Sequence, residues 1–138
     1  MAEIELTLSP ELAQLERLDS ALENAAREFR FSEELAHGIR LCAHEVFTNI
    51  VTHGFDEENY PATPVEIKII VEDSSVKLRF LDRGRAYNPV HQPDPEAPES
   101  VEDAEIGGLG VKLVKAFSSG IVYSRESENN SLEIEFQR

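Results

Sequence analysis

The chain has 138 residues, of which 41% are hydrophobic, so it can bury one sizeable core and we expect a single domain over residues 1–138. Its 27 acidic and 13 basic side chains give a formal net charge of −14. This charge argues against non-specific binding to nucleic acids and against docking on anionic membranes, because both need a basic surface.

The chain has one cysteine, Cys42, so no disulfide can form within it and a reducing compartment is expected. The first ten residues carry acidic side chains in place of the basic and apolar regions of a signal peptide. No apolar run approaches the roughly 20 residues of a membrane-spanning helix. These features predict a cytoplasmic protein.

Apolar residues in the first half of the chain alternate at strand spacing and then recur at helical spacing. They predict, in chain order, a short strand over residues 4–8, a helix from Ser9 and Pro10 to about Arg30, and a second helix that is capped by Ser32 and ends near His53 and Gly54.

The second half predicts two hairpins. The expected strand pairs are 65–69 with 76–81 across a turn at 73–75, and 121–123 with 132–136 across a turn at 128–130. Between the hairpins, residues 90–106 are rich in proline and acidic side chains, which indicates a long loop of the kind that often serves as a lid. Disorder is the other interpretation, and the two are compatible. Because the strands cluster in adjacent pairs, we expect an α+β two-layer sandwich with helices on one face of the sheet.

The stretch from His44 to Gly54 combines apolar and polar positions on one predicted helix. Glu45, Asn49 and His53 are spaced four residues apart and form one polar stripe. A carboxylate and an amide beside a core need a reason to be there. Either the stripe is the water-facing edge of the helix, or Glu45 acts as a base and Asn49 offers its side-chain oxygen to a metal ion.

Asp82 ends a predicted strand and is followed two residues later by Gly84. A carboxylate at such a position can point into a pocket and accept a hydrogen bond from an exocyclic amine such as that of adenine. The glycine would let the backbone approach a flat ring without a Cβ in the way. The same pattern is also an ordinary turn signal.

The run Gly107-Gly108-Leu109-Gly110 precedes apolar residues at helical spacing. Glycines permit tight curvature, and the unpaired N–H groups of a first helical turn attract phosphate oxygens. The run matches neither G-x-x-x-x-G-K-[ST] nor G-x-G-x-x-G, so those two nucleotide-binding folds are excluded. A flexible hinge is the alternative interpretation.

These three motifs, Glu45-x-x-x-Asn49, Asp82-x-Gly84 and the glycine run, occur in this order on a predicted helix, a strand end and a helix start. Together they resemble the GHKL ATPase superfamily. The helix stretch Glu-Val-Phe-Thr-Asn-Ile-Val-Thr-His-Gly-Phe and the stretch Gly-Gly-Leu-Gly-Val-Lys-Leu-Val are similar to those of the anti-sigma-factor serine/threonine kinases of bacterial partner switching. The resemblance implies the Bergerat ATP-binding fold, with a mixed, mostly antiparallel sheet, bound ATP and Mg²⁺, and a flexible lid at about residues 88–106.

The resemblance also implies a role for each motif residue. Glu45 would be the general base, and Asn49 would bind the nucleotide as the ligand of Mg²⁺. Asp82 would read adenine, with Gly84 beneath the ring, and Ser131 is a loose match to a hydroxyl residue that helps to hold this aspartate. The residues implied to cradle the phosphates are Gly107, Gly108, Leu109 and Gly110.

The resemblance further implies a serine/threonine protein kinase that phosphorylates a STAS-type anti-sigma-factor antagonist and regulates a sigma factor by partner switching, without direct contact to nucleic acid. Members of this subfamily often form homodimers near the first strand and helix. One alternative is an ATP-binding partner-switching module with little or no kinase activity, and another is an α+β domain without a ligand. The presence of Glu45 favours the kinase.

Overall fold

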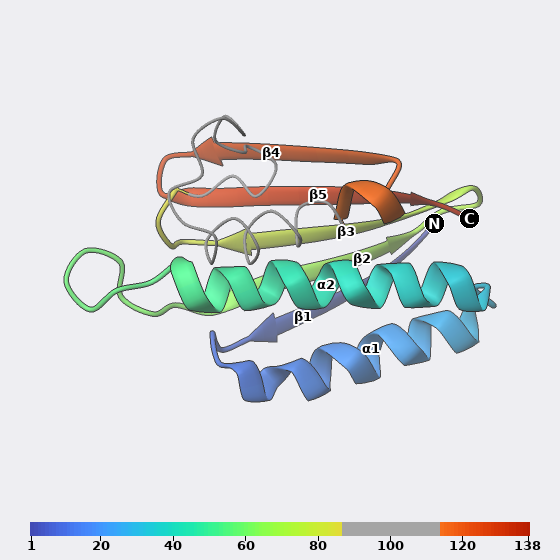
Figure 1. The fold of residues 1–138 in the computed structure, drawn as a ribbon, viewed down its shortest axis with the longest axis horizontal. Helices are drawn as coiled ribbons and strands as arrows, with labels where there is room; N and C mark the ends of the chain where they lie inside the picture. Colours follow the sequence, from blue (N-terminus) through green and yellow to red (C-terminus); the bar gives the residue numbers. More distant parts are fainter. Residues whose placement is uncertain (87–113) are drawn as a thin grey trace, which may run out of the picture.

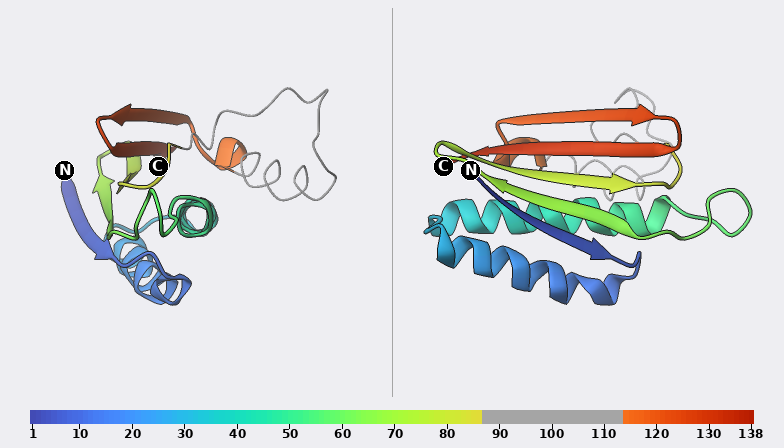
Figure 2. Two further views of the ribbon diagram at one scale, coloured as in Figure 1. Left: turned by 90° about the vertical axis from the view of Figure 1, so that its left-hand side faces the viewer. Right: turned by 180° about the vertical axis from the view of Figure 1, so that it is seen from behind.

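Residues 1–86 and 114–138, which the computed structural model describes, form a five-stranded sheet with two long helices against one of its faces (Figure 1, Figure 2). In chain order the elements are β1 (Ala2–Leu8), a short 3-10 helix (Leu12–Gln14), α1 (Leu15–Glu28), α2 (Glu33–His53), β2 (Val65–Val71), β3 (Ser75–Asp82), β4 (Gly120–Glu126) and β5 (Asn129–Gln137). Residues 114–117 form one helical turn before β4. The predicted α+β two-layer sandwich with helices on one face is confirmed.

The strand order is β1-β2-β3-β5-β4, and all four pairings are antiparallel. The prediction of a mostly antiparallel sheet is therefore confirmed. The described part of the chain contains no parallel pair, so the sheet is not mixed there. Both predicted hairpins form, as β2 with β3 and β4 with β5. The last strand, β5, lies between β3 of the first hairpin and β4 of the second, and so joins the two hairpins into one sheet.

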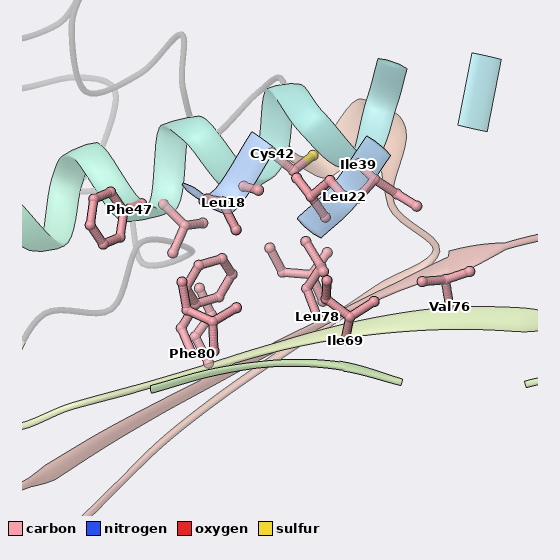
Figure 3. Packing of buried hydrophobic residues seen from close by; sticks show 14 of the residues in the cluster. Leu18, Leu22, Ile39, Cys42, Phe47, Ile69, Val76, Leu78 and Phe80 are labelled. Carbon is pink, nitrogen blue, oxygen red and sulfur yellow. The ribbon is translucent and has the colours of Figure 1, made fainter. Parts of the chain in front are cut away.

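The hydrophobic core fills the space between the two helices and the sheet (Figure 3). Alternate strand residues such as Val76, Leu78 and Phe80 point at the helices and are fully buried. The helix residues buried in this core are Leu18, Leu22 and Ala25 of α1 and Ile39, Cys42, Ala43, Val46, Phe47 and Ile50 of α2. Burial of one large apolar side chain contributes about 1.5–3 kcal/mol, so this packing fixes α2, and with it the polar stripe, against the sheet.

The opposite face of the sheet carries charged side chains that pair across strands. Lys68 of β2 lies 3.3 Å from a carboxylate oxygen of Glu5 in β1, and Arg79 of β3 donates to Glu133 of β5 at 2.8 Å. A polar outer face and an apolar inner face are typical of an antiparallel sheet that is covered on one side.

The two helices begin differently from each other. Ser32 caps α2 as predicted, because its hydroxyl oxygen accepts the backbone N–H of Leu35 at 3.1 Å. The predicted start of α1 at Ser9 is wrong: the Ser9 hydroxyl donates to the Glu11 carboxylate at 2.8 Å, and α1 begins only at Leu15, after the 3-10 turn. A local side-chain partner thus removed the hydroxyl from its capping role.

The turn of the last hairpin also differs from the prediction. It consists of Ser127 and Glu128, between the paired residues Glu126 and Asn129, and Ser127 has a φ of 57°. Asn129 and Asn130 therefore belong to β5 and not to the turn. As a result, the side chain of Asn130 lies on the inner face of the sheet and is buried.

The predicted lid at residues 88–106 and the glycine run at 107–110 lie outside the described residues. Of the helix expected after the glycines, the turn at residues 114–117 is described, and Val114 is buried there. In the described ranges, no helix combines the length and the apolar character needed to cross a membrane.

Candidate functional site

Glu45 and Asn49 lie one turn apart on α2 and are both half-buried. The amide nitrogen of Asn49 donates to Oε1 of Glu45 at 3.4 Å. This contact turns the amide nitrogen toward the carboxylate and leaves the amide oxygen, Oδ1, for another partner. His53, the third residue of the predicted stripe, is exposed in the last turn of the helix. The structure thus brings the predicted base and the predicted metal ligand together.

Cys42 lies on the buried side of the same helix with no exposed surface. Burial and, to a smaller extent, the nearby charge of Glu45 raise the pKa of Cys42 from 9.0 to about 12. A thiol with such a pKa stays protonated at neutral pH and is a poor nucleophile. Cys42 is therefore a core residue.

Asp82 is the last residue of β3, and only 7% of its surface is exposed. Its Oδ1 accepts two hydrogen bonds, from the backbone N–H of Gly84 at 2.9 Å and from Nδ2 of Asn130 at 3.0 Å. None of the described residues donates to its second oxygen, Oδ2. A buried carboxylate with one oxygen held, and with no donor among the described residues on the other, is suited to accept a hydrogen bond from a ligand.

The turn after Asp82 is fixed to the end of α2. The backbone N–H of Arg85 donates to the carbonyl oxygen of Gly54 at 2.6 Å. A Cβ on Gly84 would overlap the same carbonyl oxygen, so only glycine lets the two backbones approach this closely. At 1.5 Å per residue, Asn49 lies roughly 8 Å along the helix axis from this contact. The predicted place of Gly84 beneath a ring stays a prediction.

A loop contact reinforces the turn. The carboxylate of Asp56 accepts the backbone N–H of Asn59 at 2.6 Å and Nη2 of Arg85 at 2.8 Å. These two donors hold the pKa of Asp56 below its usual range, and the Asn59 N–H has the larger effect. The guanidinium of Arg85 also lies 5.8 Å from the ring centre of Tyr60. The loop after α2 and the turn after β3 therefore form one connected unit.

Asn130 is a functional candidate that the sequence reasoning missed. Its Nδ2 donates to Asp82, and its Oδ1 accepts from the hydroxyl of Tyr123 at 2.6 Å and from Nη1 of Arg125 at 2.9 Å. The expected match at Ser131 is corrected, because Ser131 pairs with Leu81 in the sheet and makes no hydrogen bond to Asp82.

The signal for Asn130 was present in the sequence. Leu132, Ile134 and Phe136 alternate along β5, and extending this alternation back by two residues places Asn130 on the same inner face. Assigning residues 128–130 to a turn hid this position.

The side-chain oxygen of Asn49 fits a magnesium ion that would be bound mainly through a ligand's phosphates. Mg²⁺ prefers oxygen ligands, keeps several waters and takes few protein ligands beside phosphates. The Oδ1 of Asn49 is such an oxygen, and its amide nitrogen is already occupied by Glu45. The described residues contain no cluster of three or more His, Cys, Asp or Glu side chains that could hold a metal ion by itself.

Residues 8–136 match the family described as "Histidine kinase-like ATPase domain". The chain belongs to this ATPase family. Among its curated relatives, the serine/threonine-protein kinase BtrW of Bordetella bronchiseptica is 33% identical over 115 residues, which cover 82% of this chain and 78% of the relative. The anti-sigma F factor of Anoxybacillus flavithermus is 27% identical over 97 residues, which cover 70% and 65%. These relatives place this histidine kinase-like ATPase in the anti-sigma-factor kinase branch of the GHKL superfamily, as predicted.

Solved structures share the fold of this ATPase. The structure of the RsbU and RsbW domains of a Mycobacterium tuberculosis protein superposes with a TM-score of 0.70 at 13% identity, and the match covers all of this chain and 33% of that one. The histidine kinase domain of a blue-light-activated kinase from Erythrobacter litoralis gives a TM-score of 0.54 at 19% identity, over 91% of this chain and 59% of that one. The predicted fold class is confirmed.

Proposed function

We propose that this histidine kinase-like ATPase binds ATP and transfers its γ-phosphoryl group to a serine or threonine of an anti-sigma-factor antagonist protein. The observation that carries the proposal is the pairing of Glu45 with Asn49 on the helix whose end holds the Asp82 turn. One helix thereby carries a carboxylate and an amide oxygen and positions a second, buried carboxylate.

The adenine end of the site is assigned to Asp82. Its Oδ2, to which none of the described residues donates, would accept a hydrogen bond from the exocyclic amine of adenine. Gly84 would lie beneath the ring, and its contact with Gly54 supports this assignment by holding the turn in place.

The phosphate end of the site is assigned to Asn49 and the glycine run. Asn49 would hold Mg²⁺ through Oδ1, and the ion, when bound, neutralises charge on the phosphate oxygens. The backbone N–H groups of Gly107, Gly108, Leu109 and Gly110, which lie outside the described residues, would bind the phosphates.

The reaction we propose needs one protein base. Glu45 would accept the proton of the attacking serine or threonine hydroxyl, whose oxygen forms the new bond to the γ-phosphorus. The bond from the γ-phosphorus to the bridging oxygen breaks, ADP leaves with that electron pair, and Glu45 later returns its proton to water. Positioning and charge neutralisation supply most of the acceleration in phosphoryl transfer.

The partners follow from the same proposal. The antagonist would be a STAS-type protein, and a sigma factor would bind in the alternative complex, both in the cytoplasm. A homodimer through the region of β1 and α1 is supported by the edge position of β1 and by Leu12, which is 50% exposed.

The runner-up function is an ATP-binding module that chooses between partners with little phosphoryl transfer. The two functions need the same nucleotide site but differ in their need for a base. Glu45 is half-buried and held by Asn49, which favours transfer.

Glu45→Gln separates these functions. We expect the variant to lose transfer of radiolabelled phosphate from ATP to the antagonist by roughly 10²–10⁴-fold, the usual contribution of a general base. Its affinity for ATP, measured by calorimetry, should stay within about threefold, because the isosteric amide keeps its contact with Asn49 while losing basicity.

Asp82→Asn is the matched control, since it makes the same chemical change at the adenine end. It should weaken ATP binding itself. Transfer that survives Glu45→Gln unchanged would refute the base assignment, and a wild-type protein that binds ATP without labelling any antagonist would favour the runner-up.

A further inference from the structure

The carboxylate of Asp82 is the inner end of a row of side chains that crosses three strands. In the sheet register, Asp82 of β3 pairs with Asn130 of β5, which in turn pairs with Arg125 of β4. Tyr123 lies two residues before Arg125 and points to the same face. The edge strand β4 is thereby connected to the proposed adenine site.

Asn130 is 4% exposed, and both ends of its side-chain amide are occupied. Its Nδ2 faces three acceptors, which are Oδ1 of Asp82 at 3.0 Å and the carbonyl oxygens of Gly84 at 3.3 Å and Arg85 at 2.8 Å. Its Oδ1 faces two donors, Tyr123 and Arg125. A flipped amide would set oxygen against acceptors and nitrogen against donors, which is costly in a buried site.

Arg125 can only donate, and the carbonyl oxygens of Gly84 and Arg85 can only accept. Together they determine which end of the amide faces Asp82, and the hydroxyl of Tyr123 adds a hydrogen bond to this arrangement. Arg125 makes a second contact, because the same Nη1 donates to the carbonyl oxygen of Gly84 at 2.9 Å. It therefore fixes both the amide and the turn that follows Asp82. Tyr123 acts on the amide alone.

The orientation of the amide decides what Asp82 can offer a ligand. Two donors, Nδ2 of Asn130 and the N–H of Gly84, occupy its Oδ1, which suits a carboxylate that only accepts. Its Oδ2 then accepts a hydrogen bond from an amine and repels a carbonyl oxygen at the same position. A flipped amide would set its oxygen against Oδ1 of Asp82, and the repulsion would turn the carboxylate away from the position in which Oδ2 faces the ligand.

We propose that Tyr123 and Arg125 are positioning residues which, through Asn130, make the site select a purine with a 6-amino group over one with a 6-oxo group. The proposal rests on the proposed ATP-binding function and extends it to residues that do not touch the nucleotide.

The test compares the dissociation constants of ATP and ITP, which differ in this group. They are measured by calorimetry for the wild type, Tyr123→Phe, Arg125→Gln and the double variant. We expect the wild type to prefer ATP by at least roughly tenfold. Tyr123→Phe should reduce this preference by about threefold and Arg125→Gln by about tenfold, because they lose one and two partly buried hydrogen bonds.

Two variants are matched controls. Ser131→Ala removes a hydroxyl from the residue next to Asn130, and Arg79→Gln removes a guanidinium from the outer face of β3, where it pairs with Glu133. Both should keep the wild-type preference. Circular dichroism and thermal unfolding without nucleotide establish that each variant is folded.

The readout separates positioning from a general structural role, since partial unfolding would lower ATP and ITP affinity in parallel. A parallel loss, or an unchanged ratio in both folded variants, overturns the inference and leaves ATP binding intact. A wild type that binds ATP and ITP equally also overturns it. A wild type that binds no ATP refutes the proposed function itself.

Discussion

Cys42 occupies the core beside the proposed base, and its high pKa has a measurable consequence for stability. The unfolded thiol ionises near pH 9.0, whereas the folded thiol holds its proton to about pH 12. The stabilisation is complete below pH 9 and is lost as the pH rises toward 12, by at most about 1.4 kcal/mol per pH unit. We expect urea unfolding of the wild type to show this loss.

Cys42→Ala is the reference for that experiment, because other groups also titrate in this range. The difference in unfolding free energy between wild type and variant should shrink above pH 9. A constant difference would mean that the folded thiol ionises normally. A thiol reagent at pH 8 should label the wild type only after unfolding.

At the scale of single residues, the sequence indicated the contacts between residues that are close together along the chain. Glu45 and Asn49 are four residues apart, so helical periodicity alone predicts that they are neighbours. The contact of Asn130 with Asp82 joins residues 48 positions apart and depends on the register of β3 against β5. A one-residue slip would turn the side chain of Asn130 to the other face, and no local pattern measures that register.

The contact between α2 and the turn at residues 114–117 gives a prediction about elements. A Cβ on Gly38 would lie 2.9 Å from Cδ1 of Phe117 and 3.3 Å from its Cβ and Cγ. Rotation of the ring alone does not relieve contacts that include the Phe117 Cβ, so the whole turn has to move. Gly38→Ala should therefore destabilise the protein by about 1 kcal/mol, although alanine in a helix is normally favoured by about that amount.

A double variant tests this explanation in urea unfolding. In a Phe117→Ala background the contacts with Cδ1 and Cγ are gone and only the 3.3 Å contact with the Cβ of residue 117 remains, which a small shift relieves. Adding Gly38→Ala should then stabilise the protein by roughly 0.5–1 kcal/mol. A stabilising Gly38→Ala in the wild-type background would show that the turn yields freely. The change of sign between the two backgrounds is the expected result.

The elements themselves were largely predictable, and their errors have local causes. Alternation and helical spacing predicted all five strands and both long helices, because one face of each is buried in a single core. The start of α1 and the turn before β5 were misplaced. In both cases a polar residue can adopt either of two local roles. The Ser9 hydroxyl, for example, donates to Glu11 and does not cap the helix.

For the molecule as a whole, the proposed site requires the folded state alone to bind nucleotide. A saturating ligand stabilises a protein by about 2.7 kcal/mol at 100 times its dissociation constant. For a domain of this size we expect ATP with Mg²⁺ to raise the midpoint of thermal unfolding by roughly 10 °C. ATP without Mg²⁺ should give a smaller increase, because a chain with a net charge of −14 repels an unneutralised triphosphate.

Three variants divide this thermal shift among the parts of the site. Asp82→Asn should lose most of it with or without Mg²⁺, because adenine recognition does not depend on the ion. Asn49→Ala should lose only the part that Mg²⁺ adds, and Glu45→Gln should keep the full shift, because a base acts in transfer and not in binding. If all three variants lost the shift equally, the helix and the strand end would act as one structural unit without separate roles. If the wild type showed no shift at all, the domain would be an α+β fold that does not bind ATP.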